Sequence, residues 1–217
     1  MEATETTTTS PGISRAYIWT KVFSFLGVVP LAVFTVIHLY GNLTAIQGPE
    51  AFNDHLVKTR AFPFIDLLTI LFIWVPFVMH AIWGMMKIKN ARPNNIRFNY
   101  WDNLRYITQR VSAIGVMLFV PAHIFKSKIQ PTWLEGHPAT FQHMLELAEP
   151  VTFVVYLLGI LGVAYHVANG LWQAAIGWGF TTTQKAMNRM QVFCILLFIV
   201  LLTMGYASLF TFARAGH

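Results

Sequence analysis

The chain has 217 residues, of which 55% are hydrophobic and only 11% are charged, whereas roughly a quarter of residues are charged in soluble proteins. This composition excludes an ordinary soluble domain and indicates a protein that lies in lipid. The net charge of +6 comes from basic residues in short segments between apolar runs, not from one dense stripe. We therefore expect membrane lipid around the chain and no nucleic acid as a partner.

Five apolar runs are long enough to cross a membrane, because one crossing takes about 20 helical residues. In chain order they lie at about 17–46, 62–86, 104–125, 151–178 and 190–212. The expected fold is an all-α bundle of five transmembrane helices over residues 13–217, and the Thr-rich segment 1–12 is expected to be mobile. Pro30, Pro76 and Pro121 lie inside runs, where each removes a backbone hydrogen bond and bends its helix.

The distribution of Lys and Arg predicts the orientation, since cytoplasmic loops of membrane proteins carry an excess of basic residues. With the N-terminus inside, ten basic residues fall on the inner side and five on the outer side. We therefore expect the N-terminus in the cytoplasm and the C-terminus on the periplasmic side of a prokaryotic inner membrane, which the chain crosses several times.

Four histidines stand inside the runs: His38, His80, His123 and His166 occur once each in the first four. A titratable side chain within a span is costly and usually has a function. At ~1.5 Å per residue, His38 and His123 fall in the outer half of the membrane. By the same measure His80 and His166 fall in the inner half, so the four form an outer pair and an inner pair.

Two histidine pairs at two depths are what two haems require, because each iron takes one imidazole from each of two facing helices. A zinc or di-iron site would need three or four ligands at one depth, but the runs hold essentially no central carboxylate and one isolated cysteine, Cys194. The chain also lacks a CxxCH motif for covalent attachment. Gly84, Gly159, Gly162 and Gly170 suit either the close approach of a macrocycle or ordinary helix packing.

The sequence around these histidines resembles a known family. The matching segments are FSFLGVVPLAVFTVIHL, GPEAFN, HAIWG, NLRYITQRVSAIGVMLFVPAH and YHVANGLWQAAIGWG. They are similar to the five-helix, di-haem cytochrome b membrane anchor of succinate dehydrogenases and fumarate reductases, in which a single polypeptide carries both haems. The resemblance covers nearly all of residues 17–210.

The resemblance implies that the chain is the non-flavin, electron-transfer subunit of a succinate:quinone oxidoreductase in the respiratory chain and the tricarboxylic acid cycle. It assigns His80 and His166 to a proximal haem b, and His38 and His123 to a distal haem b. The implied partners are a flavoprotein subunit with FAD and an iron–sulfur subunit, so no succinate site is expected on this chain. The expected substrate is a membrane quinone, menaquinone in particular, and whether the complex forms a higher oligomer is left open.

Further site residues follow from the expected cofactors. Haem propionates are anionic, so Arg110, Lys21 and Ser24 at the inner boundary are candidates to bind them, although the two basic residues could also only anchor helix ends. A carboxylate beside the distal haem could relay protons to a quinone. Asp54 and Asp66 lie at that level, and each could equally be a solvated residue.

Three other functions use some of the same features. The chain could be the cytochrome b anchor of another quinone-linked enzyme, of the formate dehydrogenase or hydrogenase type. A proton-coupled transporter could use the histidines as relay groups, and such a protein would be colourless. A purely structural anchor would leave electron flow to quinone intact after loss of haem.

Overall fold

The computed structural model describes residues 14–92, 96–98 and 100–216, which form helices and connecting segments without a strand. Five helical spans are long and apolar enough to cross a membrane, as predicted from the sequence. The expectation for residues 1–12 lies outside the described residues. The spans are Arg15–Gln47, Ile65–Lys89, Trp101–Leu134, Pro150–Gly177 and Gln184–Ala215.

The first three spans change helix type along their length. The first comprises α1 (Arg15–Leu26), the π-helix η1 (Gly27–Leu31), α2 (Ala32–Asn42) and the 3₁₀-helix η2 (Leu43–Gln47). The second comprises α4 (Ile65–Thr69), the π-helix η3 (Ile70–Trp74) and α5 (Val75–Lys89). The third comprises α6 (Trp101–Ile124) and the π-helix η4 (Phe125–Leu134). The last two spans are the single helices α8 (Pro150–Gly177) and α9 (Gln184–Ala215).

Proline accompanies each π-helical segment. Pro30 lies inside η1, Pro76 is the second residue after η3, and Pro121 lies four residues before η4, which itself contains Pro131. Because proline has no N–H, the carbonyl four residues earlier loses its helical partner, and a wider π turn is one way for the backbone to adapt. The helix irregularity near the three prolines thus takes the form of local π-helix, and the bends expected there stay a prediction.

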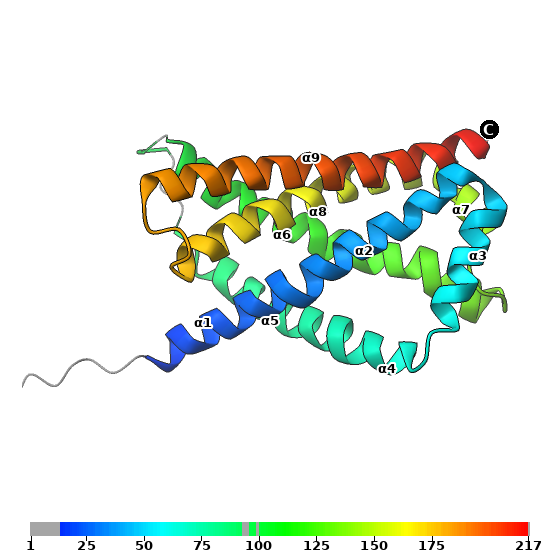
Figure 1. The fold of residues 1–217 in the computed structure, drawn as a ribbon, viewed down its shortest axis with the longest axis horizontal. Coiled ribbons are helices and arrows are strands. Elements are labelled where there is room, and N and C mark those ends of the chain that lie inside the picture. The colour runs from blue at the N-terminus through cyan, green and yellow to red at the C-terminus, as the bar shows by residue number, and fades with distance from the viewer. Residues whose placement is uncertain (1–13, 93–95, 99, 217) are drawn as a thin grey trace, which may run out of the picture.

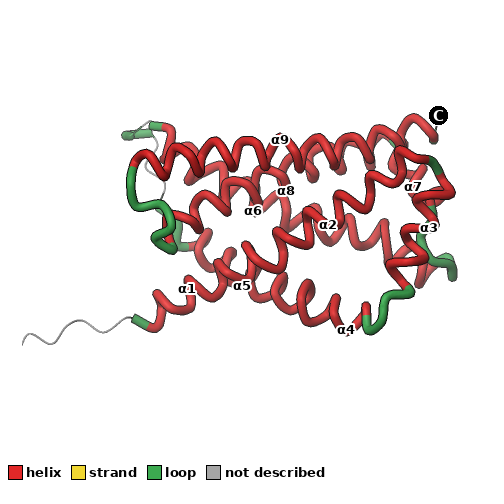
Figure 2. The backbone as a smooth tube through the Cα atoms, viewed as in Figure 1, coloured by secondary structure: helices red, strands yellow, loops and turns green. Residues whose placement is uncertain are grey.

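Consecutive spans run in opposite directions (Figure 1). Helix α8 packs against both α6 and α9, while the first span crosses the bundle diagonally. The backbone view in Figure 2 shows that helix dominates the described residues, with the connecting loops gathered at the two ends of the bundle. Where the spans do not contact one another, they present large apolar side chains such as Leu118 (72% exposed) and Leu158 (61%), as expected of a surface that lies in lipid.

A packed cap closes the end of the bundle that also carries the C-terminus (Figure 1). It is built from α3 (Pro49–Arg60), α7 (Phe141–Met144) and the 3₁₀-helix η5 (Leu145–Ala148). The backbone N–H of Phe141 donates to Asn53 Oδ1 (2.8 Å), and Arg60 donates to the Ala139 carbonyl (2.6 Å). A buried apolar cluster lies here and consists of Ala45, Phe52, Phe141, Leu147, Tyr156, Leu209 and Phe212.

The glycines expected near the histidines serve two different purposes. A Cβ on Gly159 would overlap the Phe119 ring, and one on Gly170 would lie 3.3 Å from Gln109 Nε2. Both positions therefore allow α8 to approach α6 closely, as in ordinary helix packing. By contrast, a Cβ on Gly84 would meet no described atom within 4 Å, and one on Gly162 would meet only Val116, at 4.0 Å.

Candidate functional site

The four span histidines face one another in two pairs. The rings of His80 on α5 and His166 on α8 have centroids 6.2 Å apart, with an angle of 76° between their planes. The rings of His38 on α2 and His123 on α6 have centroids 5.7 Å apart, at 77°. We call His80 and His166 the inner pair and His38 and His123 the outer pair. The structure therefore brings together the same two pairs that the depth of each histidine along its span predicts.

The two pairs lie at different levels of the bundle. Tyr156 contacts His123 and stands ten residues before His166 on the same uninterrupted helix, α8. Ten helical residues correspond to about 15 Å along the axis. Each level therefore presents its own two imidazoles from two facing helices, and no single ion could contact all four rings.

The protein holds three of the rings by their Nδ1 atoms. His80 Nδ1 lies 3.0 Å from the Phe23 carbonyl, to which it donates. The close approach depends on Gly27, because a Cβ there would lie 2.6 Å from His80 Nδ1. His123 Nδ1 lies 3.2 Å from the Tyr156 hydroxyl. A histidine bonded through Nδ1 presents Nε2 as its free lone pair, which is the usual state of a metal ligand.

A chain of hydrogen bonds between α6 and α8 orients His166. Arg105 Nε donates to Asn169 Oδ1 (3.0 Å), and Asn169 Nδ2 donates to Gln109 Oε1 (2.7 Å). Gln109 Nε2 then donates to the His166 carbonyl (3.2 Å). Ser112 Oγ donates to the Gln109 carbonyl (2.9 Å), so the hydroxyl oxygen can accept from His166 Nδ1, 3.3 Å away. Gln109 Nε2 also lies 3.2 Å from this ring nitrogen. Each amide is thus held in one orientation by its neighbour.

Arg105 is a buried cation that the sequence analysis did not single out. Its side chain is 7% exposed, and its guanidinium lies 3.5 Å from the centroid of the Trp172 ring. Among the described residues, its Nη1 has no hydrogen-bond partner and no carboxylate lies within 4 Å. The signal was available in the sequence, since Arg105, Gln109 and Ser112 recur at helical spacing within a span.

The outer pair differs in its hydrogen bonds. His38 Nε2 lies 3.3 Å from Asn42 Nδ2, which also donates to the His38 carbonyl (2.8 Å). This nitrogen therefore accepts a weak hydrogen bond from its own helix. For His38 to present Nε2 to a metal, the amide of Asn42 must give up that contact while keeping its bond to the backbone.

Both pairs have the dimensions of a two-imidazole metal site. A metal–imidazole bond is about 2 Å long, so rings on opposite sides of one ion have centroids about 6 Å apart. At the inner level, Gly84 and Gly162 also leave open space beside the rings. The unpaired Arg105 Nη1 suits an anion. The residues thus fit a flat metal macrocycle with anionic substituents, and the assignment of the four histidines as iron ligands stays a prediction.

The predicted propionate-binding residues lie near the inner level in different settings. Lys21 Nζ donates to the Gly177 carbonyl at the end of α8, so it joins α1 to that helix end. Arg110 donates to the Tyr106 carbonyl (2.6 Å) and stacks on that ring, while its Nε is buried without a partner among the described residues. Ser24 is half-buried one turn after Lys21. Their propionate role stays a prediction.

The two predicted quinone-site carboxylates occupy distinct environments. Asp54 forms an exposed ion pair with Lys58 (2.6 Å) on α3. Asp66 lines a groove of about 450 Å³ between the start of the second span and η4, where Ile124 adjoins His123. The lining is mainly apolar, and it consists of Asp66, Thr69, Ile70, Trp74, Ile124, Lys128, Ile129 and Trp133.

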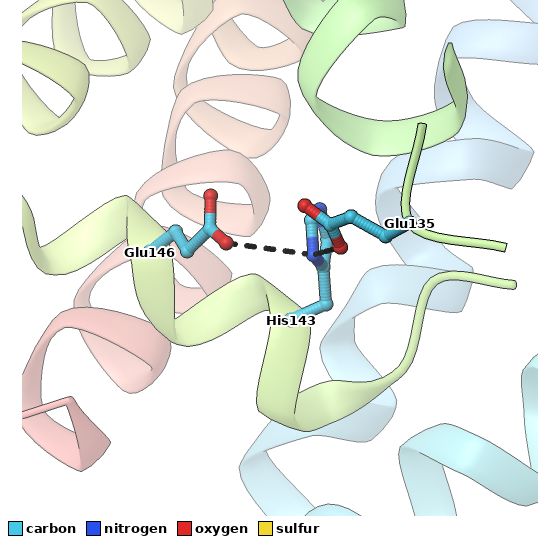
Figure 3. A group of neighbouring side chains, drawn as sticks. All are labelled: Glu135, His143 and Glu146. Carbon is cyan, nitrogen blue, oxygen red and sulfur yellow. Dashed lines mark ion pairs between the residues drawn. The ribbon is translucent and has the colours of Figure 1, made fainter. Parts of the chain in front are cut away.

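A second polar cluster, not predicted from the sequence, lies at the same end of the bundle (Figure 3). His143 Nδ1 lies 3.5 Å from Glu135 and 3.6 Å from Glu146, and its Nε2 lies 2.8 Å from the Lys126 carbonyl. The three side chains could hold a metal ion. However, Lys126 Nζ already lies 2.6 Å from Glu146, so a lysine cation balances part of the negative charge.

The ion pair has a consequence for acid stability. The hydrogen bond from Lys126 holds the pKa of Glu146 below its ordinary value of 4.5, although partial burial opposes this effect. A lowered pKa in the folded state stabilises the fold fully above the ordinary pKa, and this stabilisation is lost as the pH falls through the folded value. Because the Glu146 side chain is 40% exposed, solvent screening limits the gain to about 0.5 kcal/mol.

Comparison with known proteins gives a similarity over most of the chain. The chain is 30% identical over 200 residues to the succinate dehydrogenase cytochrome b558 subunit of Bacillus subtilis (strain 168), and the alignment covers 92% of this chain and 98% of that protein. No family model matches the chain. Because the alignment spans nearly all of both proteins, the similarity concerns the complete bundle.

Replacement of Asn169 by Leu tests the hydrogen-bond chain. The change leaves Arg105 Nε and Gln109 Oε1 without partners, and each unsatisfied buried polar group costs about 1–3 kcal/mol. We expect the thermal unfolding midpoint of the purified protein to fall by several degrees. Asn188→Leu, at an exposed position on α9, is the matched control and should have little effect. Equal changes in the two variants would contradict the role of the network.

Replacement of Lys126 by Met tests the ion pair. The variant should unfold about 1–2 °C lower than the wild type at about pH 5.5, and the difference should shrink as the pH falls through the lowered pKa of Glu146, because the protonated carboxyl no longer pairs with Lys126. Thermal unfolding followed by circular dichroism across this range measures the difference. Lys128→Met, which removes a lysine from the same segment, should not change the pH dependence. A constant difference between wild type and Lys126→Met at all pH values would show that the ion pair is not its cause.

Proposed function

The chain belongs to the family of succinate dehydrogenase cytochrome b subunits, and from this premise we propose that it connects an iron–sulfur subunit with a membrane quinone through two b haems. It is a multi-pass protein of the bacterial membrane and a subunit of an enzyme complex, consistent with its five apolar spans. The observation that carries the proposal is the presence of two facing histidine pairs at two levels.

When bound, each haem supplies a one-electron carrier whose potential depends on its ligands and surroundings. The chain contributes the ligands and their orientation. Three of the proposed ligands are held through Nδ1, by the Phe23 carbonyl, the Tyr156 hydroxyl and Ser112. Such hydrogen bonds fix the ring and raise the basicity of the coordinating nitrogen. The apolar helices around both levels exclude water from the irons.

At the inner level, Arg105 joins the propionate-binding residues proposed from the sequence. A buried guanidinium with an unpaired N–H is stabilised by an anion, and Arg105 offers one on the same helix as Arg110. Lys21 and Ser24 approach the same boundary from α1. We assign the proximal haem to the inner pair and the distal haem to the outer pair.

The Asp66 groove is the proposed quinone site. Its apolar walls with Trp74 and Trp133 suit an aromatic headgroup, and its volume falls in the usual range for small-molecule sites. Asp66, Thr69 and Lys128 are the polar lining groups available to hydrogen-bond quinone oxygens. A carboxylate at this position can deliver or accept the protons that quinone chemistry requires. Asp54 is the weaker candidate, because its carboxylate is paired with Lys58 on the exposed face of α3.

The proposed partners are a flavoprotein subunit with FAD and an iron–sulfur subunit, docked at the inner end. The basic bias of the segments 87–105 and 181–189 supports a cytoplasmic position for this end. Membership of the succinate dehydrogenase family favours this assembly over the formate dehydrogenase or hydrogenase alternative. Menaquinone is the proposed quinone.

Spectroscopy of the purified complex tests the function. We expect two b haems per chain by pyridine haemochrome quantitation, both reducible with succinate. In variants that still assemble, His38→Met and His123→Met should perturb one low-spin signal, and His80→Met and His166→Met the other, because each iron needs two imidazoles at one level. His137→Met, in an exposed loop, serves as the control. One haem per chain, or a shared effect of His38 and His80 variants, would overturn the assignment.

Replacement of Asp66 by Asn tests the quinone site. Loss of a proton-relaying group commonly slows a reaction by about 10²-fold or more, so succinate:quinone reductase activity should fall strongly, while electron transfer from succinate to both haems is retained. Asp54→Asn is the matched control and should keep near-normal activity. If the two variants behave alike, the groove is not the site of quinone chemistry.

Labelling of single cysteines in intact cells tests the orientation. Lys58→Cys, in the cap, should react with a membrane-impermeant maleimide, and Lys89→Cys, at the opposite end, should react only after permeabilisation. Both positions are exposed, whereas the native Cys194 is buried and gives a low background. The reverse pattern would place the N-terminus outside.

A further inference from the structure

A shallow groove of about 410 Å³ lies at the start of α9, at the end of the bundle opposite the cap. It is far from the outer histidine pair and is not part of the proposed quinone site. Its lining consists of Thr181, Thr183, Lys185, Ala186, Arg189, Met190 and Phe193.

The polar half of this groove is built to bind an anion. Lys185 and Arg189 are exposed and one turn apart, so they share a face of α9. Among the described residues, neither cation has a carboxylate within 4 Å. Thr183 caps α9, whose first-turn N–H groups have no helical acceptor. The positive end of this 32-residue helix adds to the field of the two side chains.

Thr181 gives independent evidence for a ligand. Its side chain lines the groove and is only 9% exposed, yet its Oγ1 has no hydrogen-bond partner among the described residues. Buried hydroxyls are normally hydrogen-bonded, because an unmade bond is costly. A ligand oxygen in the groove would satisfy this hydroxyl.

The other half of the groove is apolar and reaches into the membrane. Phe193 stands ten residues after the cap residue Thr183, which places it about 15 Å further along the helix axis. It is 53% exposed, and Leu196 and Val200 continue the exposed apolar surface beyond it, at 57% and 51%. The groove thus leads from a cationic helix start to a surface that lies in hydrocarbon.

We propose that this groove binds an anionic phospholipid. The phosphodiester contacts Thr181, Lys185, Arg189 and the start of α9, and an acyl chain lies along Met190 and Phe193. A free phosphate ion would leave the apolar half without a partner. A water-soluble protein partner would not reach Phe193, which lies at membrane depth. Only a ligand with an anionic head and an apolar tail uses both halves.

Lipid analysis of the intact complex tests the proposal. The complex is extracted in a mild detergent, washed, and its retained phosphatidylglycerol is quantified by mass spectrometry. The double variant Lys185→Gln, Arg189→Gln should bind phosphatidylglycerol about 25-fold more weakly, because each basic residue near a membrane surface contributes about fivefold to the affinity for anionic lipid. The matched control is Lys87→Gln, Lys89→Gln, which removes two exposed lysines at the same end of the bundle and should retain the lipid.

Two further measurements test the role of Thr181 and the preference for an anionic lipid. Thr181→Val preserves shape and both charges, and it should weaken retention several-fold without detaching the catalytic subunits. In the wild type, added phosphatidylglycerol should raise the unfolding midpoint, and phosphatidylcholine should not. Unchanged lipid content in the double variant, displacement of the lipid by millimolar inorganic phosphate, or release of the catalytic subunits in place of lipid would each overturn the proposal.

Discussion

The structure depends on the rule that a polar group inside a membrane must find its partner within the protein, because hydrocarbon offers none. The chain of hydrogen bonds from Arg105 through Asn169 and Gln109 to His166 satisfies this rule across α6 and α8. It fixes the rotation of both helices about their axes, since a turn of either would break several bonds. The orientation of His166 follows from this constraint.

The first span orients His80. His80 reaches the Phe23 carbonyl at the junction of α1 and the π-helix η1, beside Gly27. A side chain at Gly27 would displace the imidazole, and the Phe23 carbonyl accepts from His80 in addition to the Gly27 N–H of its own helix. A glycine and a backbone carbonyl of the first span thus orient a proposed metal ligand on the second span.

The two ends of the bundle are built for different surroundings. The cap end is densely packed, with its buried aromatic cluster and its ion pairs between Lys126, Glu146 and their neighbours. The opposite end has a cationic groove and exposed basic residues. In our proposal, the cap covers the outer end of the bundle, and the opposite end contacts lipid headgroups and the catalytic subunits.

The amino-acid sequence alone determined the five spans and the four histidines within them, because span length and hydropathy are local properties and depth follows from a constant rise per residue. It did not determine the cap, because α7 has only four residues and both α3 and α7 pack through Phe52 and Phe141 against Phe212 from a distant segment. The contact partners of Arg105, Tyr156 and Lys128 were decided only by the tertiary structure. Their contacts join residues 33 to 64 positions apart or line a groove between two spans, and such distances depend on how helices pack, which no local pattern of residues records.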